Sequence, residues 1–148
     1  MILLDTNVIS EPMRHHPEGR VISWLDAQAP ETLFLSTVSL SEILLGIESL
    51  LLGKRRKALA AALEHLLSLF HERILPFDVG AAEVYPRIVL RARHQGHPIA
   101  VGDAQIAAIA ALRQFSVATR DEAPFRAAGL PVINPWTAVL EPEPHCER

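Results

Sequence analysis

Short apolar runs alternate with longer amphipathic segments along the chain. The runs are rich in Leu, Ile and Val, and they predict strands at residues 2–4, 33–35, 74–75, 116–119 and 131–133. Helical spacing predicts helices between them, at residues 6–11, 21–29, 40–52, 55–71, 81–95, 103–113 and 122–128. Strands separated by long helices form right-handed crossovers, which place them in a parallel sheet with helices on both faces. The pattern therefore predicts an α/β fold, a three-layer α/β/α sandwich with a central, mainly parallel sheet.

Length and composition indicate one folded domain. The chain has 148 residues, of which 49% are hydrophobic and 21% charged, and domains commonly have roughly 100–200 residues. We expect the domain to span residues 1–140 and the polar, proline-interrupted segment 141–148 to be a disordered tail. The single cysteine, Cys146, excludes an internal disulfide and a cysteine-based zinc site. No signal peptide or apolar stretch of about 20 residues is present, so we expect a cytoplasmic protein.

The net charge restricts the class of function. It is −3, from 14 Lys and Arg against 17 Asp and Glu. This balance argues against a protein that coats nucleic acid, because such a protein binds phosphates through Lys and Arg. The same net charge is compatible with an enzyme that binds phosphate groups through bound metal cations.

Four acidic residues fall where predicted strands end and helices begin. Asp5 ends the first strand, Glu42 lies in the first turn after the second strand, Asp103 begins an alanine-rich helix, and Asp121 follows the strand 116–119. In an open parallel sheet, ligands bind at this carboxyl edge. If the strands that carry these acids are neighbours, the four carboxylates share one cleft.

Each acid also has a structural explanation of its own. Asp5 and Asp121 can cap the helices that follow them. Ser39 and Glu42 fit a capping box, in which the glutamate bonds back to the backbone of the serine. Asp103 can stabilise the positive end of a helix dipole. The sequence alone leaves both interpretations open.

A shared acidic cleft would have a definite chemistry. Like charges at short distance raise one another's pKa, and a divalent cation removes that conflict. Oxygen ligands without Cys or His select hard ions such as Mg²⁺ or Mn²⁺ over Zn²⁺. A cation held in this way lowers the pKa of a bound water and neutralises a phosphoryl oxygen during displacement. The four acids therefore indicate metal-dependent phosphate-ester chemistry.

Five motifs, in order, resemble those of a known family. They are DTNVISE at 5–11, SLSEILLG at 39–46, PIAVGDAQIAA at 98–108, TRD at 119–121 and VINPW at 132–136. Together they are similar to the motifs of PIN-domain ribonucleases, in particular VapC-type toxins of bacterial toxin–antitoxin pairs and their FitB-like branch. The resemblance covers residues 1 to about 137.

The resemblance implies an activity, a cofactor and partners. It implies a Mg²⁺- or Mn²⁺-dependent endoribonuclease, the toxin of a type II toxin–antitoxin system, which hydrolyses RNA phosphodiester bonds with a metal-activated water. It also implies a homodimer and inhibition by a cognate antitoxin protein. Carried over to this sequence, Asp5 and Asp103 are the principal metal ligands, Glu42 and Asp121 complete the metal pocket, and Thr6 places a hydroxyl beside the metal waters.

One departure and two alternative functions remain. Many relatives have Thr-Arg-Asn followed by an Asp three residues later, whereas here Asp121 stands at the Asn position and Pro124 at the later one. The main alternative is a catalytically silent PIN-like module that binds an antitoxin or RNA. A phosphatase with an aspartyl nucleophile needs a second Asp where this chain has Asn7.

Basic groups and leucine-rich helices suggest further contacts. The run KRRK at 54–57 is either a solvated helix start or a contact for RNA phosphate or antitoxin. A second basic group lies on one predicted helix and could line a substrate groove; it consists of Arg87, Arg91, Arg93 and His94. The segments 43–52 and 59–70 hold more leucine than one face can bury, which predicts a self-association surface.

Overall fold

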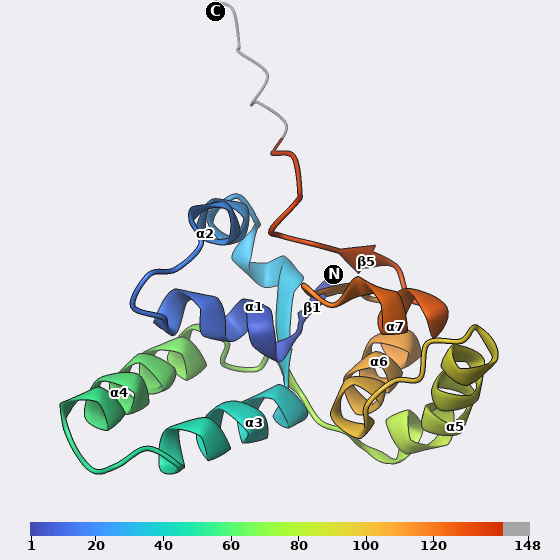
Figure 1. Ribbon diagram of the computed structural model, residues 1–148, viewed down its shortest axis with the longest axis horizontal. Coiled ribbons are helices and arrows are strands. Elements are labelled where there is room, and N and C mark those ends of the chain that lie inside the picture. The colour runs from blue at the N-terminus through green and yellow to red at the C-terminus, as the bar shows by residue number, and fades with distance from the viewer. Residues whose placement is uncertain (141–148) are drawn as a thin grey trace, which may run out of the picture.

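Five parallel strands form the central sheet of the protein, whose computed structural model describes residues 1–140. Their order across the sheet is β3-β2-β1-β4-β5 (Figure 1). The strands are β1 (Ile2–Leu4), β2 (Leu33–Ser36), β3 (Ile74–Leu75), β4 (Ser116–Ala118) and β5 (Val132–Ile133). The predicted α/β sandwich is confirmed, and the sheet is parallel throughout. The tail predicted at 141–148 lies outside the described residues.

The first strand lies at the centre of the sheet. It pairs with β2 on one side, through Leu3 and Phe34, and with β4 on the other side, through Leu4 and Ala118. The chain therefore fills one half of the sheet with β2 and β3 and the other half with β4 and β5. Such a change of direction leaves a crevice at the carboxyl ends of the strands, where ligands bind in open α/β sheets.

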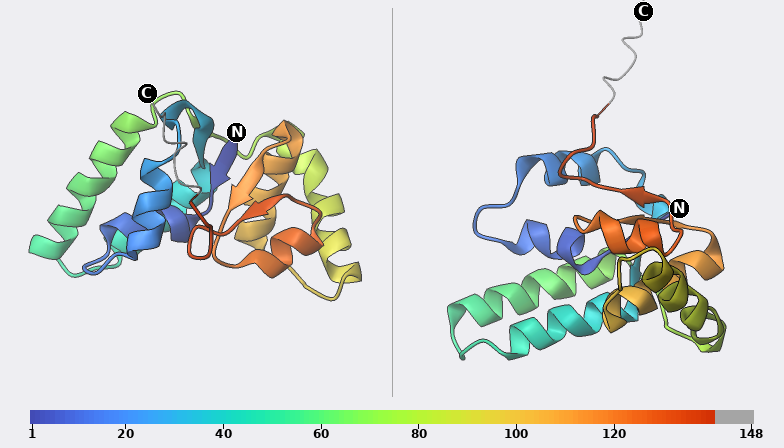
Figure 2. Two further views of the ribbon diagram at one scale, coloured as in Figure 1. Left: turned by 90° about the horizontal axis from the view of Figure 1, so that it is seen from above. Right: turned by 45° about the vertical axis from the view of Figure 1, so that its right-hand side comes forward.

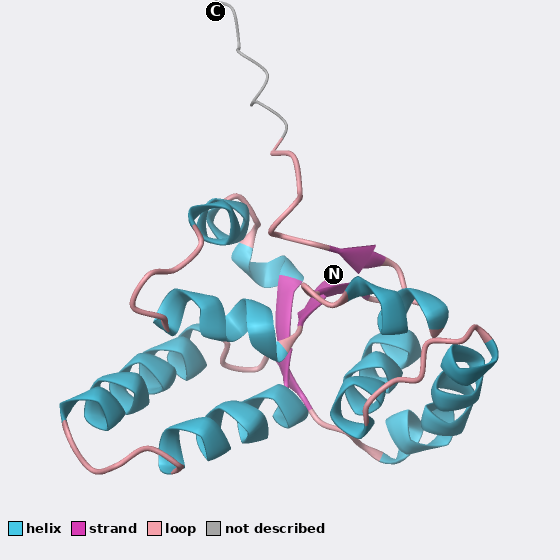
Figure 3. Ribbon diagram, viewed as in Figure 1, coloured by secondary structure: helices cyan, strands magenta, loops and turns pink. Residues whose placement is uncertain are grey.

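Helices cover both faces of the sheet (Figures 2 and 3). On one face lie α1 (Thr6–Ser10), α2 (Gly19–Asp26), α3 (Thr37–Glu48) and α4 (Lys54–Leu69), with short 3-10 turns η1 (Glu11–Met13) and η2 (Pro30–Thr32). On the other face lie α5 (Val79–His94), α6 (Val101–Arg113) and α7 (Glu122–Ala127). None of the helices within residues 1–140 is long and apolar enough to cross a membrane.

Each face has its own apolar core. Ile106, Val117 and Phe125 are fully buried in the layer that holds α5, α6 and α7. Val8 and Trp24 are buried in the other layer. Burying an aliphatic or aromatic side chain of this size stabilises a fold by about 1.5–3 kcal/mol, so the two cores hold the sheet edge rigid from both sides.

The capping box predicted at Ser39 is wrong. Helix α3 begins at Thr37, and its N-cap is Ser36, whose Oγ accepts a hydrogen bond from the Ser39 backbone N–H at 3.0 Å. The reason is that β2 runs into α3 without an intervening loop. Glu42 therefore lies in the second turn of the helix, and its carboxylate is bonded elsewhere.

Candidate metal centre

The carboxylate of Asp5 is buried at the carboxyl end of β1, with only 4% of the residue exposed. Its Oδ1 accepts a hydrogen bond from the Thr6 backbone N–H at 2.7 Å, so the predicted capping role is correct. Its Oδ2 accepts a second bond from the Thr119 hydroxyl at 2.8 Å. Burial raises the pKa of Asp5, and the bonds from Thr119 and Thr6 oppose that rise. The structural interpretation of Asp5 is therefore confirmed, and its predicted role in a metal site stays compatible with it.

Thr119 connects the ends of the two central strands. Its side chain is fully buried directly after β4, and its Oγ1 accepts a bond from the Asp121 backbone N–H at 3.1 Å. Asn7 reaches the same segment, because its Oδ1 accepts from the Arg120 backbone N–H at 3.4 Å. The sequence pattern indicated Thr119 only as the last residue of a strand. Its position in the TRD motif is the signal that could have identified it.

Glu42 is held above the cleft by α1. Its Oε2 accepts a hydrogen bond from the Thr6 hydroxyl. Its Oε1 lies so close to α6 that a Cβ atom added to Gly102 would be 2.7 Å from it. Because Gly102 has no side chain, there is room for the Glu42 carboxylate at this position. Sequence reasoning missed this role of Gly102. Helix α3 contacts both α1 and α6, whose first residues face the ends of β1 and β2 (Figure 1).

Asp103 lies in the first turn of α6 and is half-buried. Burial, together with the charges of Asp5, Glu42 and Asp121, raises its pKa from the ordinary 3.8 to about 6. The four predicted acids therefore lie near enough to one another for the charges of three of them to act on Asp103; that they form one metal site stays a prediction. Asp121 precedes α7 without capping it through its side chain, so the capping interpretation of Asp121 is wrong.

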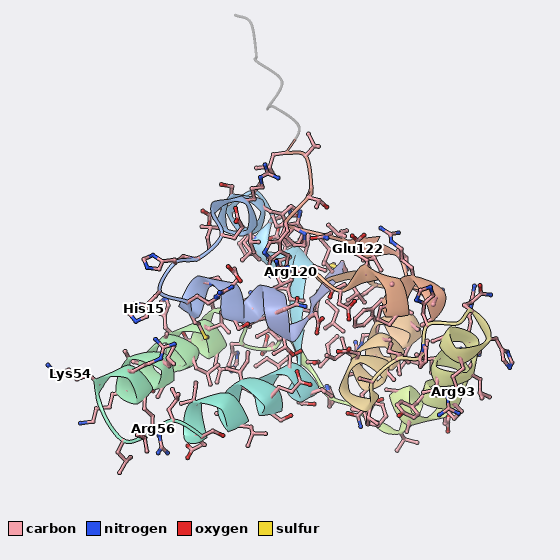
Figure 4. All side chains as sticks on the ribbon, viewed as in Figure 1. His15, Lys54, Arg56, Arg93, Arg120 and Glu122 are labelled. Atoms are coloured by element: carbon pink, nitrogen blue, oxygen red, sulfur yellow. The ribbon has the colours of Figure 1, made fainter. Side chains whose placement is uncertain are left out.

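A fifth acid next to the cleft is held away from it. Glu122, labelled in Figure 4, lies at the start of α7. It accepts hydrogen bonds from Asn134 at 2.9 Å and from Arg126 at 2.8 Å. These bonds lower the pKa of Glu122, and the bond from Asn134 has the larger effect. Asn134 also accepts a bond from the Trp136 backbone N–H at 3.0 Å. The VINPW motif therefore anchors α7 to the last strand, and Glu122 does not share the cleft.

The donor chemistry of the cleft fits a hard divalent cation. The cleft combines carboxylate oxygens with the hydroxyls of Thr6 and Thr119. Within residues 1–140, no three His, Cys, Asp or Glu side chains are gathered into a ready-made cage around an ion. Mg²⁺ commonly takes one or two carboxylates and completes its shell with waters. An open cleft of mutually repelling carboxylates suits such an ion.

The fold and this acidic cleft define a PIN domain. A family model described as PIN domain matches residues 2–130, and the chain belongs to that family. It is 51% identical to the plasmid stability protein StbB of Pseudomonas syringae pv. tomato over 93% of this chain and 100% of that protein. It is 47% identical to the toxin FitB of Neisseria gonorrhoeae over 92% of this chain and 99% of FitB.

A further relative and a solved structure are also similar to this chain. The VapC ribonuclease Y4jK of Sinorhizobium fredii is 44% identical over 92% of this chain and 98% of its own length. The crystal structure of FitAcB from N. gonorrhoeae superposes with a TM-score of 0.88 at 47% identity, covering 93% of this chain and 100% of that one. The resemblance to PIN-domain toxins of the FitB-like branch is confirmed.

The raised pKa of Asp103 predicts an unusual pH dependence of stability. Because the folded-state pKa of about 6 exceeds the ordinary 3.8, the contribution of Asp103 to stability is full below pH 3.8 and is lost as pH rises through about 6. Without metal at neutral pH, Asp103→Asn should therefore raise the free energy of unfolding. The gain should be on the order of 1 kcal/mol, since solvent screens a half-exposed carboxylate.

Urea unfolding in chelator, near pH 7.5 and near pH 4.5, measures this difference. The gain from Asp103→Asn should shrink at the lower pH. Glu122→Gln is a control of opposite sign: the pKa of Glu122 is lowered, so its stabilising contribution is present at neutral pH and is lost on acidification. An equal effect of Asp103→Asn at both pH values would contradict the prediction.

Proposed function

We propose that the protein is a Mg²⁺- or Mn²⁺-dependent endoribonuclease and the toxin of a type II toxin–antitoxin pair. The observation that carries the proposal is that burial and the charges of Asp5, Glu42 and Asp121 together raise the pKa of Asp103 to about 6, which supports one shared acidic site. A cleft that binds no cation would gain nothing from this repulsion. The names of the relatives, toxin FitB and VapC ribonuclease, support RNA as the substrate.

The residues of the cleft have separate roles in this proposal. Asp5 and Asp103 would be the principal ligands of the ion, and Glu42 and Asp121 would complete its pocket. When bound, the ion lowers the pKa of a water and neutralises charge on the scissile phosphate. Thr119 fixes the direction of the Asp5 carboxylate through its 2.8 Å bond. Thr6 fixes Glu42 in the same way, since ligands that are oriented by hydrogen bonds bind metal more tightly.

The proposed partners follow from the same relatives. We infer a cognate antitoxin protein, because the chain is similar to the toxin FitB and to the solved FitAcB and FitAB structures. The solved structure of FitAB bound to a DNA fragment, 46% identical with a TM-score of 0.89 over 97% of this chain and 99% of that one, supports a multi-component assembly. We place the activity in the cytoplasm, where RNA is present. The silent-module alternative is disfavoured because the chain retains all four acids, and three of them act electrostatically on Asp103.

Charge-neutralising substitutions test the proposed metal site. Asp5→Asn and Asp103→Asn should each reduce Mg²⁺- or Mn²⁺-dependent RNA cleavage by more than about 100-fold, a larger loss than is typical of residues that only orient metal ligands. Glu122→Gln removes the same charge next to the cleft and should cleave normally. Cleavage by gel assay, with circular dichroism as a check on folding, measures the effect. Parental cleavage by both Asp5→Asn and Asp103→Asn would contradict the proposal.

Gly102→Ala tests whether RNA cleavage requires the space beside the Glu42 carboxylate. The added methyl would displace the Glu42 carboxylate and break its bond from Thr6, so cleavage should fall about tenfold or more. Thermal stability should stay equal or rise, because alanine is favoured over glycine in a helix by up to about 1 kcal/mol. Gly19→Ala, at the start of α2, meets no heavy atom within 4 Å and is the matched control. Normal cleavage by Gly102→Ala would refute the role of this space.

Exposed leucines on α3, α4 and their connection support the proposed homodimer. Leu45 is 69% exposed, Leu51 92% and Leu52 87%. Contiguous apolar surface of this kind marks an interface. Light scattering should give twice the chain mass of 16.3 kDa at micromolar concentration, and Leu51→Gln with Leu52→Gln should shift the protein toward the single chain. A single-chain mass for the unaltered protein would count against the dimer.

A further inference from the structure

A groove begins at Thr6 and Glu42 and is lined by residues of α1, α3 and α4. Figure 1 shows where these three helices lie. The inner part of the groove, of about 270 Å³, begins at Thr6 and Glu42, which belong to the cleft. Its outer part, of about 540 Å³, continues past His15 and Lys54. Both parts are lined by the same four side chains, Met13, Arg14, Arg55 and Leu59, so they form one continuous groove.

The side chains along this groove are basic beyond its acidic beginning. Glu42 is its only acidic lining residue among those that the structure describes, whereas Arg14, His15, Lys54 and Arg55 all line it. Within residues 1–140, neither Lys54 nor Arg55 has a carboxylate within 4.0 Å. In a chain of net charge −3, this is a local concentration of positive charge that the fold does not neutralise.

Arg14 joins the cleft end of the groove to its outer end. It pairs with the buried Glu11 at 3.3 Å, yet 60% of its side chain is exposed. Thr6 is the first residue of α1, whereas Arg14 follows directly after η1, so the two lie at opposite ends of this helical segment. Figure 4 shows His15 and Lys54 at the outer end, on the loop after η1 and at the start of α4. The basic groups therefore follow the groove outward from the place where a scissile phosphate would meet the acids.

We propose that this groove binds the phosphate backbone of the RNA strand on one side of the scissile bond. The inference rests on the proposed ribonuclease function and adds to it a substrate-binding surface. Polyanion binding fits a row of cations of which two, Lys54 and Arg55, have no carboxylate partner within residues 1–140, because each phosphate contact releases a counterion. The lining also includes apolar side chains such as Met13 and Leu59, and no Phe, Tyr or Trp lines either part. Because base stacking by such aromatic rings is missing and phosphate contacts carry no sequence information, the groove contributes affinity with little sequence preference.

The other basic group does not share this groove. Arg93 lies on α5, on the opposite side of the sheet (Figure 4). It lines neither part of the groove. The two basic groups that the sequence left as candidates are thus separated in space. Arg93 provides a control with the same kind of charge removal.

Binding of a labelled single-stranded oligouridylate tests the groove. In an Asp103→Asn background, which binds without cutting, Lys54→Gln with Arg55→Gln should weaken binding about tenfold in fluorescence anisotropy. The slope of log affinity against log salt should become shallower by about 1.4, or about 0.7 for each lost phosphate contact. Arg93→Gln in the same background should leave affinity and slope unchanged. Both groove positions are exposed, and thermal melting checks that the variants fold.

The test separates this inference from the proposed function. If the unaltered protein fails to cut any RNA, the ribonuclease proposal fails and the groove inference with it. If it cuts RNA but the groove variant binds oligouridylate with unchanged affinity and salt slope, the groove inference alone is overturned. A variant that loses binding only to a protein partner would overturn it as well, since the groove would then be a protein interface.

Discussion

The hydrogen bond from the Thr119 hydroxyl to the buried Asp5 carboxylate is the contact on which the site depends. It joins residues 114 positions apart in sequence, at the ends of the two central strands. Burying a carboxylate costs free energy unless it is hydrogen-bonded, and this bond offsets part of that cost. The same threonine accepts from the backbone of Asp121. One side chain thereby fixes two of the four acids relative to each other.

The acidic side chains of the cleft repel one another. Burial and this repulsion together raise the pKa of Asp103 to about 6. The surrounding fold holds this arrangement through apolar cores on both faces of the sheet, in which Phe125 and Val8 are fully buried. A cation bound there would relieve the repulsion and thereby also stabilise the fold. Sites of this kind trade stability for function.

The elements were predictable from the sequence because hydrophobic periodicity is local, whereas the contacts within the site were not. The order of strands decides whether Asp5 and Asp121 meet, and no local pattern contains that order. The capping box failed for the same reason, since the SLSE motif does not reveal that β2 continues straight into α3. Gly102 and Thr119 act through residues distant in sequence. The motifs identified all four acids, but not the groups that hold them.

The central place of β1 also has a consequence for synthesis of the protein on the ribosome. Strand β1 is synthesised first, but one of its two edges stays unpaired until β4, which begins at Ser116, has been made. Until then Asp5 lacks its bond from Thr119 and the cleft lacks Asp121. Non-local pairing of this kind also forms late in folding. A growing chain therefore cannot bring Asp121 and Thr119 to the end of β1 until most of it has been translated.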